Sequence, residues 1–203
     1  MDLEVVKQNL EKRQFKVSVF NTAKLASEYL NSEIDNTTVG MGGSVTIREM
    51  GLFDSLSSHN KVFWHNHPEQ VKELGAPYIR NQAGNADVYI SSVNGLSVSG
   101  QIINIDGFGN RIASTAYGHK KLYLVVGKNK LADTFEDAMW RAKNIAAPKN
   151  AQRLGLATPC AKKGDKCYNC NSPAKICRGF MIMEAPLTSQ ETEVILINEN
   201  LGY

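Results

Sequence analysis

Four cysteines gathered in one short stretch carry the sharpest chemical signal in this 203-residue chain. Four thiolates are the number of ligands that a tetrahedral zinc ion or a cubane iron–sulfur cluster takes. Only the second and third cysteines form a Cys-x-x-Cys pair, and arginine follows the last one where the ferredoxin motif has proline. We therefore predict a metal-binding segment that holds zinc or an iron–sulfur cluster, with free thiols or a redox pair as the alternative. The residues are Cys160, Cys167, Cys170 and Cys177, in the segment 160–177.

A glycine-rich turn is the second candidate. Gly40-Met41-Gly42-Gly43-Ser44 follows a predicted strand and opens a predicted helix. Glycines let backbone N–H groups approach an anion, and a helix N-terminus favours negative charge. The turn lacks the Lys-Ser/Thr of a P-loop and the third spaced glycine of a dinucleotide fingerprint. It therefore predicts a cradle for phosphate or carboxylate at Gly42, Gly43 and Ser44, or alternatively a tight turn of structural use only.

A third candidate is the loop 104–111, which follows a predicted strand and reads Asn-Ile-Asp-Gly-Phe-Gly-Asn-Arg. Open α/β sheets bind ligands at the carboxyl ends of their strands. Asp106 has the chemistry of a general base or of a partner for a substrate hydroxyl, and Arg111 that of a clamp for carboxylate or phosphate. Gly107 and Asn110 complete the predicted site. The alternative is an Asx-type turn in which Arg111 pairs with Asp106.

The elements that must position these loops alternate between helix and strand almost throughout. The near-continuous apolar run 121–126 indicates a buried strand, which we place centrally in a sheet. Asp133 and Glu136 are spaced as a capping pair for a helix that Pro148 should end or kink. The whole pattern predicts one α/β domain over 1–203, an open, mostly parallel sheet flanked by helices. The predicted helices are 3–12, 22–34, 45–50, a segment after 68 and 133–145, and the predicted strands are 15–20, 37–41, 62–65, 88–93, 101–105, 121–126, 180–184 and 193–198.

Composition excludes several classes of protein. The chain is 42% hydrophobic and 21% charged, with a net charge of +3, so it is not disordered, collagen-like or a coiled coil. Residues 118–178 hold 13 Lys and Arg against 4 Asp and Glu. Because no aromatic motif is interleaved with these cations, we interpret them as a solvated face and expect no nucleic-acid partner. We also expect no transmembrane segment, a cytoplasmic location, and structural roles for the four histidines.

Four consecutive blocks of the sequence carry a family resemblance. They read GMGGSVTIREMGL (40–52), ADVYISSVNGLSVSGQIINIDGFGNRIAS (86–114), GHKKLYLVVGKNKL (118–131) and RAKNIAAPKNAQRLGLATPC (141–160). Together they resemble the lactate utilization, or LUD, domain family over most of residues 35–203. The cysteine segment is similar to that of the family members that carry Thr-Pro-Cys followed by Cys-x-x-Cys.

The resemblance implies a fold similar to sugar-phosphate isomerases, CoA-transferases and formyltetrahydrofolate cyclo-ligase. It also implies a bacterial protein linked to the oxidation of L-lactate to pyruvate, beside iron–sulfur partner proteins. The residues that match the family's glycine-rich turn and its Asp-Gly-x-Gly-Asn-Arg block are Gly42, Gly43, Ser44, Asp106, Gly107, Asn110 and Arg111.

Three functions from different classes follow. The first is a lactate utilization protein that binds a small anionic metabolite between the Gly40–Ser44 turn and the Asp106–Arg111 loop. The second is a CoA-transferase- or isomerase-like enzyme acting on small carboxylates or sugar phosphates, with a carboxylate such as Glu49 as its nucleophile. The third is an iron–sulfur electron-transfer or docking module built on the cysteines. A homo-oligomer is a further assembly that we consider.

Overall fold

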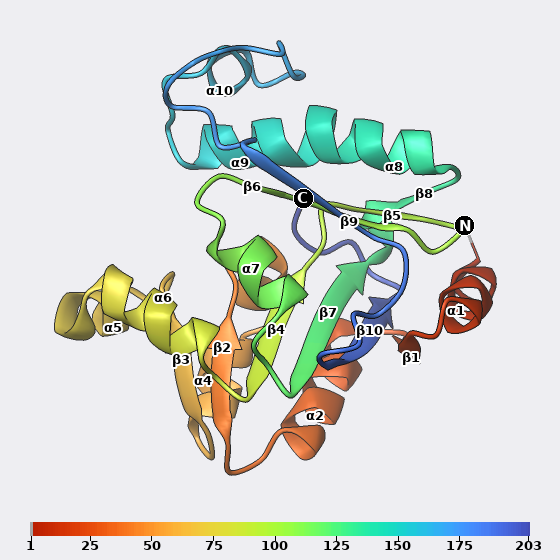
Figure 1. Cartoon of the computed structure of the whole chain (residues 1–203), viewed down its shortest axis with the longest axis vertical. Helices are drawn as coiled ribbons and strands as arrows, with labels where there is room; N and C mark the ends of the chain where they lie inside the picture. The colour runs from red at the N-terminus through yellow and green to blue at the C-terminus, as the bar shows by residue number, and fades with distance from the viewer. Residues whose placement is uncertain (1) are drawn as a thin grey trace.

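A computed structural model describes residues 2–203 as two β-sheets with helices around them (Figure 1). The strands are β1 (Lys16–Phe20), β2 (Thr38–Met41), β3 (Lys61–Trp64), β4 (Val88–Ser92), β5 (Gly95–Ser97), β6 (Ile102–Asp106), β7 (Lys121–Gly127), β8 (Leu131–Ala132), β9 (Gly179–Met183) and β10 (Glu191–Ile197). The α-helices are α1 (Leu3–Lys12), α2 (Ala23–Glu33), α3 (Val45–Glu49), α4 (Leu52–Ser57), α5 (Pro68–Leu74), α6 (Ala76–Gly84), α7 (Asn110–Ala116), α8 (Phe135–Arg141), α9 (Ala147–Arg153) and α10 (Pro159–Lys163). A 3₁₀ turn, η1 (Lys128–Lys130), follows β7, and a π-helical stretch, η2 (Ala142–Ala146), joins α8 to α9.

The larger sheet has six strands in the order β1-β10-β7-β4-β2-β3, and every neighbouring pair is parallel. This confirms the predicted α/β class with its open parallel sheet. The predicted central strand is also confirmed, because β7 lies between β10 and β4 and six of its seven residues are buried. Since all six strands run the same way, their carboxyl ends meet at one edge of the sheet, as the site prediction requires.

A second sheet of four strands, in the order β8-β5-β6-β9, was not predicted. Strands β5 and β8 have three and two residues, too few for a period-two pattern to be visible in the sequence. β6 pairs antiparallel with both β5 and β9. Strand β9 comes directly after the cysteine segment, so that segment is anchored at one end in this sheet.

The layers are held together by three apolar clusters. One face of the parallel sheet packs on α2, α3 and α4 through residues such as Leu30, Ile47 and Leu56. The other face packs on α1, α6 and the second sheet. The outer face of the second sheet packs on α8 through Ile105 and Ala138. The second sheet is therefore a middle layer between the parallel sheet and the long helix drawn across the top of Figure 1.

One prediction about that long helix is wrong, and a second is wrong in one of its two alternatives, that Pro148 ends the helix. Its N-terminal cap is Thr134, whose Oγ1 accepts a hydrogen bond from the backbone N–H of Asp137 at 3.0 Å, so the capping pair lies one residue beyond Asp133 and Glu136. The helix also continues past Pro148 to Arg153. Proline lacks a backbone N–H and its ring clashes with the carbonyl four residues earlier. The wider π-helical turn before Pro148 gives that ring room, so the chain continues as a helix.

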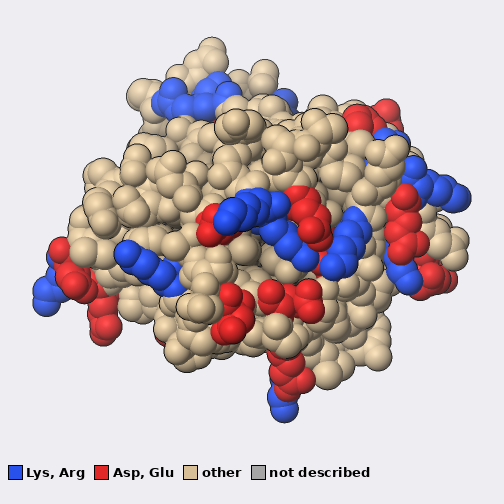
Figure 2. Space-filling model, turned by 60° about the horizontal axis from the view of Figure 1, so that its bottom comes forward, with Lys and Arg blue, Asp and Glu red and all other residues tan. Residues whose placement is uncertain are grey.

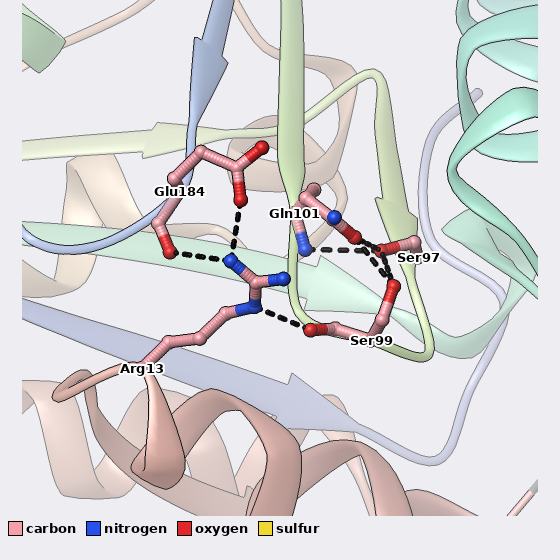
Figure 3. A network of polar contacts seen from close by, with 5 residues as sticks. All are labelled: Arg13, Ser97, Ser99, Gln101 and Glu184. Carbon is pink, nitrogen blue, oxygen red and sulfur yellow. Dashed lines mark hydrogen bonds and ion pairs between the residues drawn. The ribbon is translucent and has the colours of Figure 1, made fainter.

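A polar network ties α1 to the second sheet (Figure 3). Arg13, at the end of α1, donates from Nε to the Ser99 carbonyl at 2.5 Å and from Nη1 to the Glu184 carbonyl at 3.1 Å, and it also forms an ion pair with the Glu184 carboxylate. Gly100 lies against the arginine with φ of +92°, and an added Cβ would come within 2.8 Å of Arg13 Cδ. Only glycine suits both this backbone conformation and this close contact.

Across residues 2–203, no helix has both the length and the apolar character needed to cross a membrane.

Candidate functional site

A cavity of about 500 Å³ opens at the edge where the parallel strands end. Residues that follow five different strands line it: Gly43 and Ser44 after β2, His65 after β3, Asn94 after β4, Lys130 after β7 and Tyr203 after β10. The loop after β6, helix α9 and the segment before β9 close its other sides. The cavity is thus assembled from parts of the chain far apart in sequence, which is typical of a ligand site in an open α/β sheet.

The glycine-rich turn packs directly against the Asp106 loop. A Cβ added to Gly42 would lie 3.2 Å from Arg111 Cδ and 3.0 Å from Ser91 Oγ, so this glycine makes room for the arginine. Gly43 and Ser44 line the cavity, whereas Gly42 lies behind Arg111. Ser44 also caps α3, accepting from the Ile47 N–H at 3.3 Å. The structure therefore brings the two predicted loops together.

The carboxylate of Asp106 organises its own loop. Its Oδ1 accepts from the N–H groups of Gly107 and Phe108 at 2.7 and 3.3 Å, and Oδ2 accepts from those of Arg111 and Ile112 at 3.0 and 3.1 Å. Burial raises the pKa of this carboxyl, but the charge of Arg111 and the backbone N–H groups outweigh burial and hold the pKa below its ordinary value. This is the Asx-type turn of the alternative prediction, but the predicted pairing is wrong, because only the backbone N–H of Arg111, and not its guanidinium, bonds to Asp106.

The guanidinium of Arg111 bonds to uncharged acceptors only. Nη1 donates to the Ser92 carbonyl at 3.1 Å and to Asn104 Oδ1 at 2.7 Å. Nη2 donates to Asn94 Oδ1 at 3.0 Å and to the Ile105 carbonyl at 2.5 Å. These four bonds fix the group in one orientation without neutralising its charge by direct contact with a carboxylate. Arg111 is thus a rigid positive charge in the wall of the cavity.

Five further cations line the cavity and were missed as site residues by the sequence analysis. They are Arg80, Lys130, Arg153, Lys175 and Arg178. Within residues 2–203, every ion pair lies elsewhere and none includes a cavity-lining cation. Four of the 13 cations in the segment 118–178 belong to this set, so part of the predicted solvated face points into a cavity instead. Their excess in the sequence was the available signal.

Lys130 is the most enclosed of these cations, with a residue exposure of 3%. Its Nζ donates to Thr46 Oγ1 at 2.8 Å and to Ser92 Oγ at 2.7 Å. Burial, followed by the charges of Arg141 and Arg111, lowers the pKa of this amine to about 7. At neutral pH a substantial fraction of Lys130 is therefore uncharged.

The imidazole of His65 is a neutral group at the rim of the same cavity. Burial and the nearby charge of Arg80 lower its pKa to about 4. Its Nδ1 is buried and has no hydrogen-bond partner among the described residues. The expected structural role does hold for His67, which caps α5, and for His119, whose Nδ1 contacts the Ala86 carbonyl at 2.6 Å. Glu49 lies outside the cavity lining, where its Oε2 accepts from the Gly202 N–H at 2.7 Å.

All four cysteines line a second, smaller pocket, so the fold does gather them. Each thiol is free and partly buried. Cys167 Sγ accepts from the Asn169 N–H at 3.3 Å, and Asn169 has the left-handed backbone that this tight Cys-x-x-Cys turn needs. Burial and the neighbouring Cys167 raise the pKa of the Cys177 thiol. In residues 2–203, however, no three Cys, His, Asp or Glu side chains form a group spaced to hold a metal ion.

The two pockets share one wall. Ala147, Lys175 and Ile176 line both the cavity at the strand ends and the pocket of the cysteines. Gly107 allows this arrangement, because a Cβ added to it would come within 2.8 Å of the Ile176 backbone. The cysteine segment is therefore part of the enclosure of the larger cavity.

Comparisons with solved structures give the fold. The chain is similar to a DUF162 family protein from Deinococcus radiodurans, with a TM-score of 0.52 and 11% identity over 96% of this chain and 95% of that one. A weaker likeness, to ribose 5-phosphate isomerase A from Neisseria gonorrhoeae, has a TM-score of 0.35 and 16% identity over 66% of this chain and 65% of that one. No curated protein matches the sequence.

The sequence profile of the LUD domain matches residues 3–197, nearly the whole described chain. The match includes both predicted loops, the cations of the cavity and all four cysteines. The chain therefore belongs to the LUD domain family, which is associated with lactate utilization.

Proposed function

We propose that the cavity at the strand ends binds a small anionic metabolite of lactate oxidation, with L-lactate and pyruvate as the first candidates. The observation that carries this proposal is the set of five lining cations beside the amine of Lys130, none of them in an ion pair. Arg153 and Arg178 are exposed and keep their hydration, but like charges gathered around one cavity without carboxylate partners repel one another. A bound carboxylate or phosphate would offset that repulsion.

In this proposal each predicted site residue has a distinct role. Arg111 supplies a fixed positive charge for the ligand's carboxylate, and Gly43 and Ser44 let the backbone of the turn approach it. Asp106 holds the loop that carries Gly107, Asn110 and Arg111, because both of its oxygens are occupied by backbone N–H groups. We therefore assign Asp106 to positioning rather than to proton transfer, and Arg111 to ligand binding.

Isothermal titration calorimetry tests the proposal with pyruvate, L-lactate, inorganic phosphate and ribose 5-phosphate. Arg153→Gln removes a cavity charge whose guanidinium otherwise contacts only Asn150, so the fold should tolerate it. We expect the affinity for the preferred anion to fall about ten-fold, which is the value of one charge-assisted hydrogen bond. Lys120→Gln is the matched control, because Lys120 pairs with Asp87 at the opposite edge of the sheet. Equal affinity in all three proteins would overturn the proposal.

We also propose that the cysteine segment holds zinc or an iron–sulfur cluster and, with a cluster, meets iron–sulfur partner proteins of lactate oxidation. Four thiols around one pocket have the right donor chemistry, and the N–H···S bond to Cys167 is a contact that tunes such sites. Bound zinc would serve structure, whereas a cluster would supply electron transfer. Anaerobic purification with metal analysis and a visible spectrum separates these outcomes, and a metal-free protein with four titratable thiols would contradict both.

A further inference from the structure

The amine of Lys130 stands apart from every other lysine of the described chain. It lines the cavity, yet its surroundings are those of a protein core. Five other lysines, in contrast, lie within 4.0 Å of a carboxylate; they are Lys7, Lys16, Lys24, Lys120 and Lys121. A buried lysine without a carboxylate partner is costly, so its chemistry requires an explanation.

The side-chain nitrogen of Lys130 donates two hydrogen bonds, to Thr46 and Ser92, so one of its tetrahedral positions is not used by the protein. The hydroxyl of Thr46 donates to the Leu201 carbonyl at 3.2 Å, and the hydroxyl of Ser92 donates to the Val125 carbonyl at 2.6 Å. Because both hydroxyl hydrogens are used in this way, both oxygens act as acceptors toward Nζ. A neutral amine satisfies them with its two N–H bonds, and its lone pair is then directed away from them.

The charges around Lys130 favour that neutral form. Arg111 and Arg141 are its charged neighbours of the same sign, whereas Glu49, the one acid that acts on it, forms no ion pair with it. Arg141 is itself fixed by bonds to the carbonyls of Asn129 and Asn94 at 2.8 and 2.6 Å, so it cannot move away. A nucleophilic lysine is activated in this manner, by burial and by neighbouring cations.

We propose that Lys130 is the nucleophile of this site and forms an imine with the carbonyl carbon of an α-keto acid, whose carboxylate is attracted by the positive charge of Arg111. This inference rests on the proposed function and narrows its ligand to keto acids such as pyruvate. The nitrogen lone pair attacks the carbonyl carbon to give a carbinolamine. The former carbonyl oxygen then leaves as water with both hydrogens of the amine, and a carbon–nitrogen double bond remains. The step is a condensation and requires no oxidant or reductant.

Reductive trapping tests the inference on the intact 203-residue chain. Pyruvate is added with sodium borohydride, which reduces the imine to a stable secondary amine, and peptide mass spectrometry locates the adduct. We expect modification at Lys130 well above that at any other lysine, and none when L-lactate, which lacks a carbonyl group, replaces pyruvate. Lys120→Gln, which removes a lysine that pairs with Asp87 at the opposite edge of the sheet, should leave the modification unchanged. Lys130→Met should abolish it.

Because the adduct is mapped in the protein without any substitution, the test does not depend on whether a variant folds. An unmodified Lys130, or equal labelling of surface lysines, would overturn the inference. Calorimetry with pyruvate distinguishes this failure from that of the proposed function. Pyruvate that binds without forming an adduct refutes only the imine, whereas pyruvate that neither binds nor reacts counts against both.

Discussion

The cations at the two edges of the parallel sheet differ in whether they are paired with carboxylates. At the amino ends of the strands, Lys16 and Lys121 lie 3.0 and 3.2 Å from the carboxylate of Glu193, which is fully buried. Figure 2 turns the lower side of Figure 1 toward the viewer and shows Lys and Arg side chains lying against Asp and Glu there. At the carboxyl ends, five cations and the amine of Lys130 line a cavity, and none of them forms an ion pair among the described residues.

This difference separates charge that serves the fold from charge that is available to a ligand. Glu193 also accepts from Ser18 Oγ at 2.7 Å and from Tyr29 Oη at 2.8 Å, so its environment is complete within the chain. Arg111 and Lys130, in contrast, donate hydrogen bonds only to uncharged oxygens and have no carboxylate partner. A bound anion would supply at the carboxyl ends of the strands the negative charge that Glu193 supplies at the amino ends.

The largest effect should follow from removing the charge of Glu193. Burial raises the pKa of this carboxyl, but hydrogen bonds from Ser18, Tyr29 and Lys16 outweigh it and lower the pKa. We expect Glu193→Gln to reduce the free energy of unfolding by about 2–4 kcal/mol, measured by urea denaturation. Glu191→Gln, at an exposed carboxylate, should cost less than about 1 kcal/mol. Equal costs would contradict the view that the amino-end cluster is structural.

The same variant should change how stability depends on pH. A carboxyl whose pKa is lowered by folding stabilises the protein above its unfolded pKa of about 4.3, and that contribution is lost as the pH falls through the folded value. Glu193→Gln should therefore flatten the loss of stability on the acid side. Unfolding curves at a series of pH values below about 5 measure this. An unchanged slope would show that other carboxyls govern acid unfolding.

Two lysine variants should have smaller effects on the free energy of unfolding, and the effects should differ in direction. Lys121→Met removes one partner of a buried carboxylate, so we expect a loss of about 1–3 kcal/mol in unfolding free energy. Lys130→Met replaces an unpaired buried amine by an apolar chain of similar length, so stability should stay constant or rise by about 1 kcal/mol. A Lys130→Met protein that loses as much as Lys121→Met would mean that Lys130 has a structural role.

The smallest expected effect is that of salt. Because the cavity cations act on a ligand through charge, pyruvate affinity should fall several-fold between about 0.05 and 0.5 M sodium chloride. The partly exposed Lys120–Asp87 pair should have no influence on this dependence, so Lys120→Gln should give the same curve. Affinity that does not respond to salt would argue for an apolar mode of binding.

The sequence predicted the parallel sheet because its strands have strong local patterns, as in the apolar run of β7. It also predicted that the Gly42 turn and the Asp106 loop meet, since both follow strands. Strands β5 and β8 of the second sheet are too short to show a period, and α7 begins inside the segment 104–111, for which the sequence predicts a loop. The continuous helix that runs from α8 through α9 is longer than predicted, because a π-helical turn before a proline leaves no clear signal in the sequence.

The candidate site was predicted in part for a similar reason. Arg80, Lys130 and Arg178 come together only through the order of the strands, which local patterns do not specify. Lys130 could have been found, because it lies three residues after the central buried strand, where open α/β sheets place ligands. His65 was predicted to have a structural role, because the two histidines at the end of the expected strand have no third metal ligand nearby in the sequence.

Titrating isotopically labelled protein with pyruvate, followed by nuclear magnetic resonance, tests the central claim most directly, because it observes both edges of the sheet at once. We predict saturable shifts at Gly43, Asn110 and Lys130, with Lys16, Lys121 and Glu193 unchanged. Shifts confined to the amino-end cluster, or no saturable shift at either edge, would contradict the claim that the unpaired cations at the strand ends form an anion site.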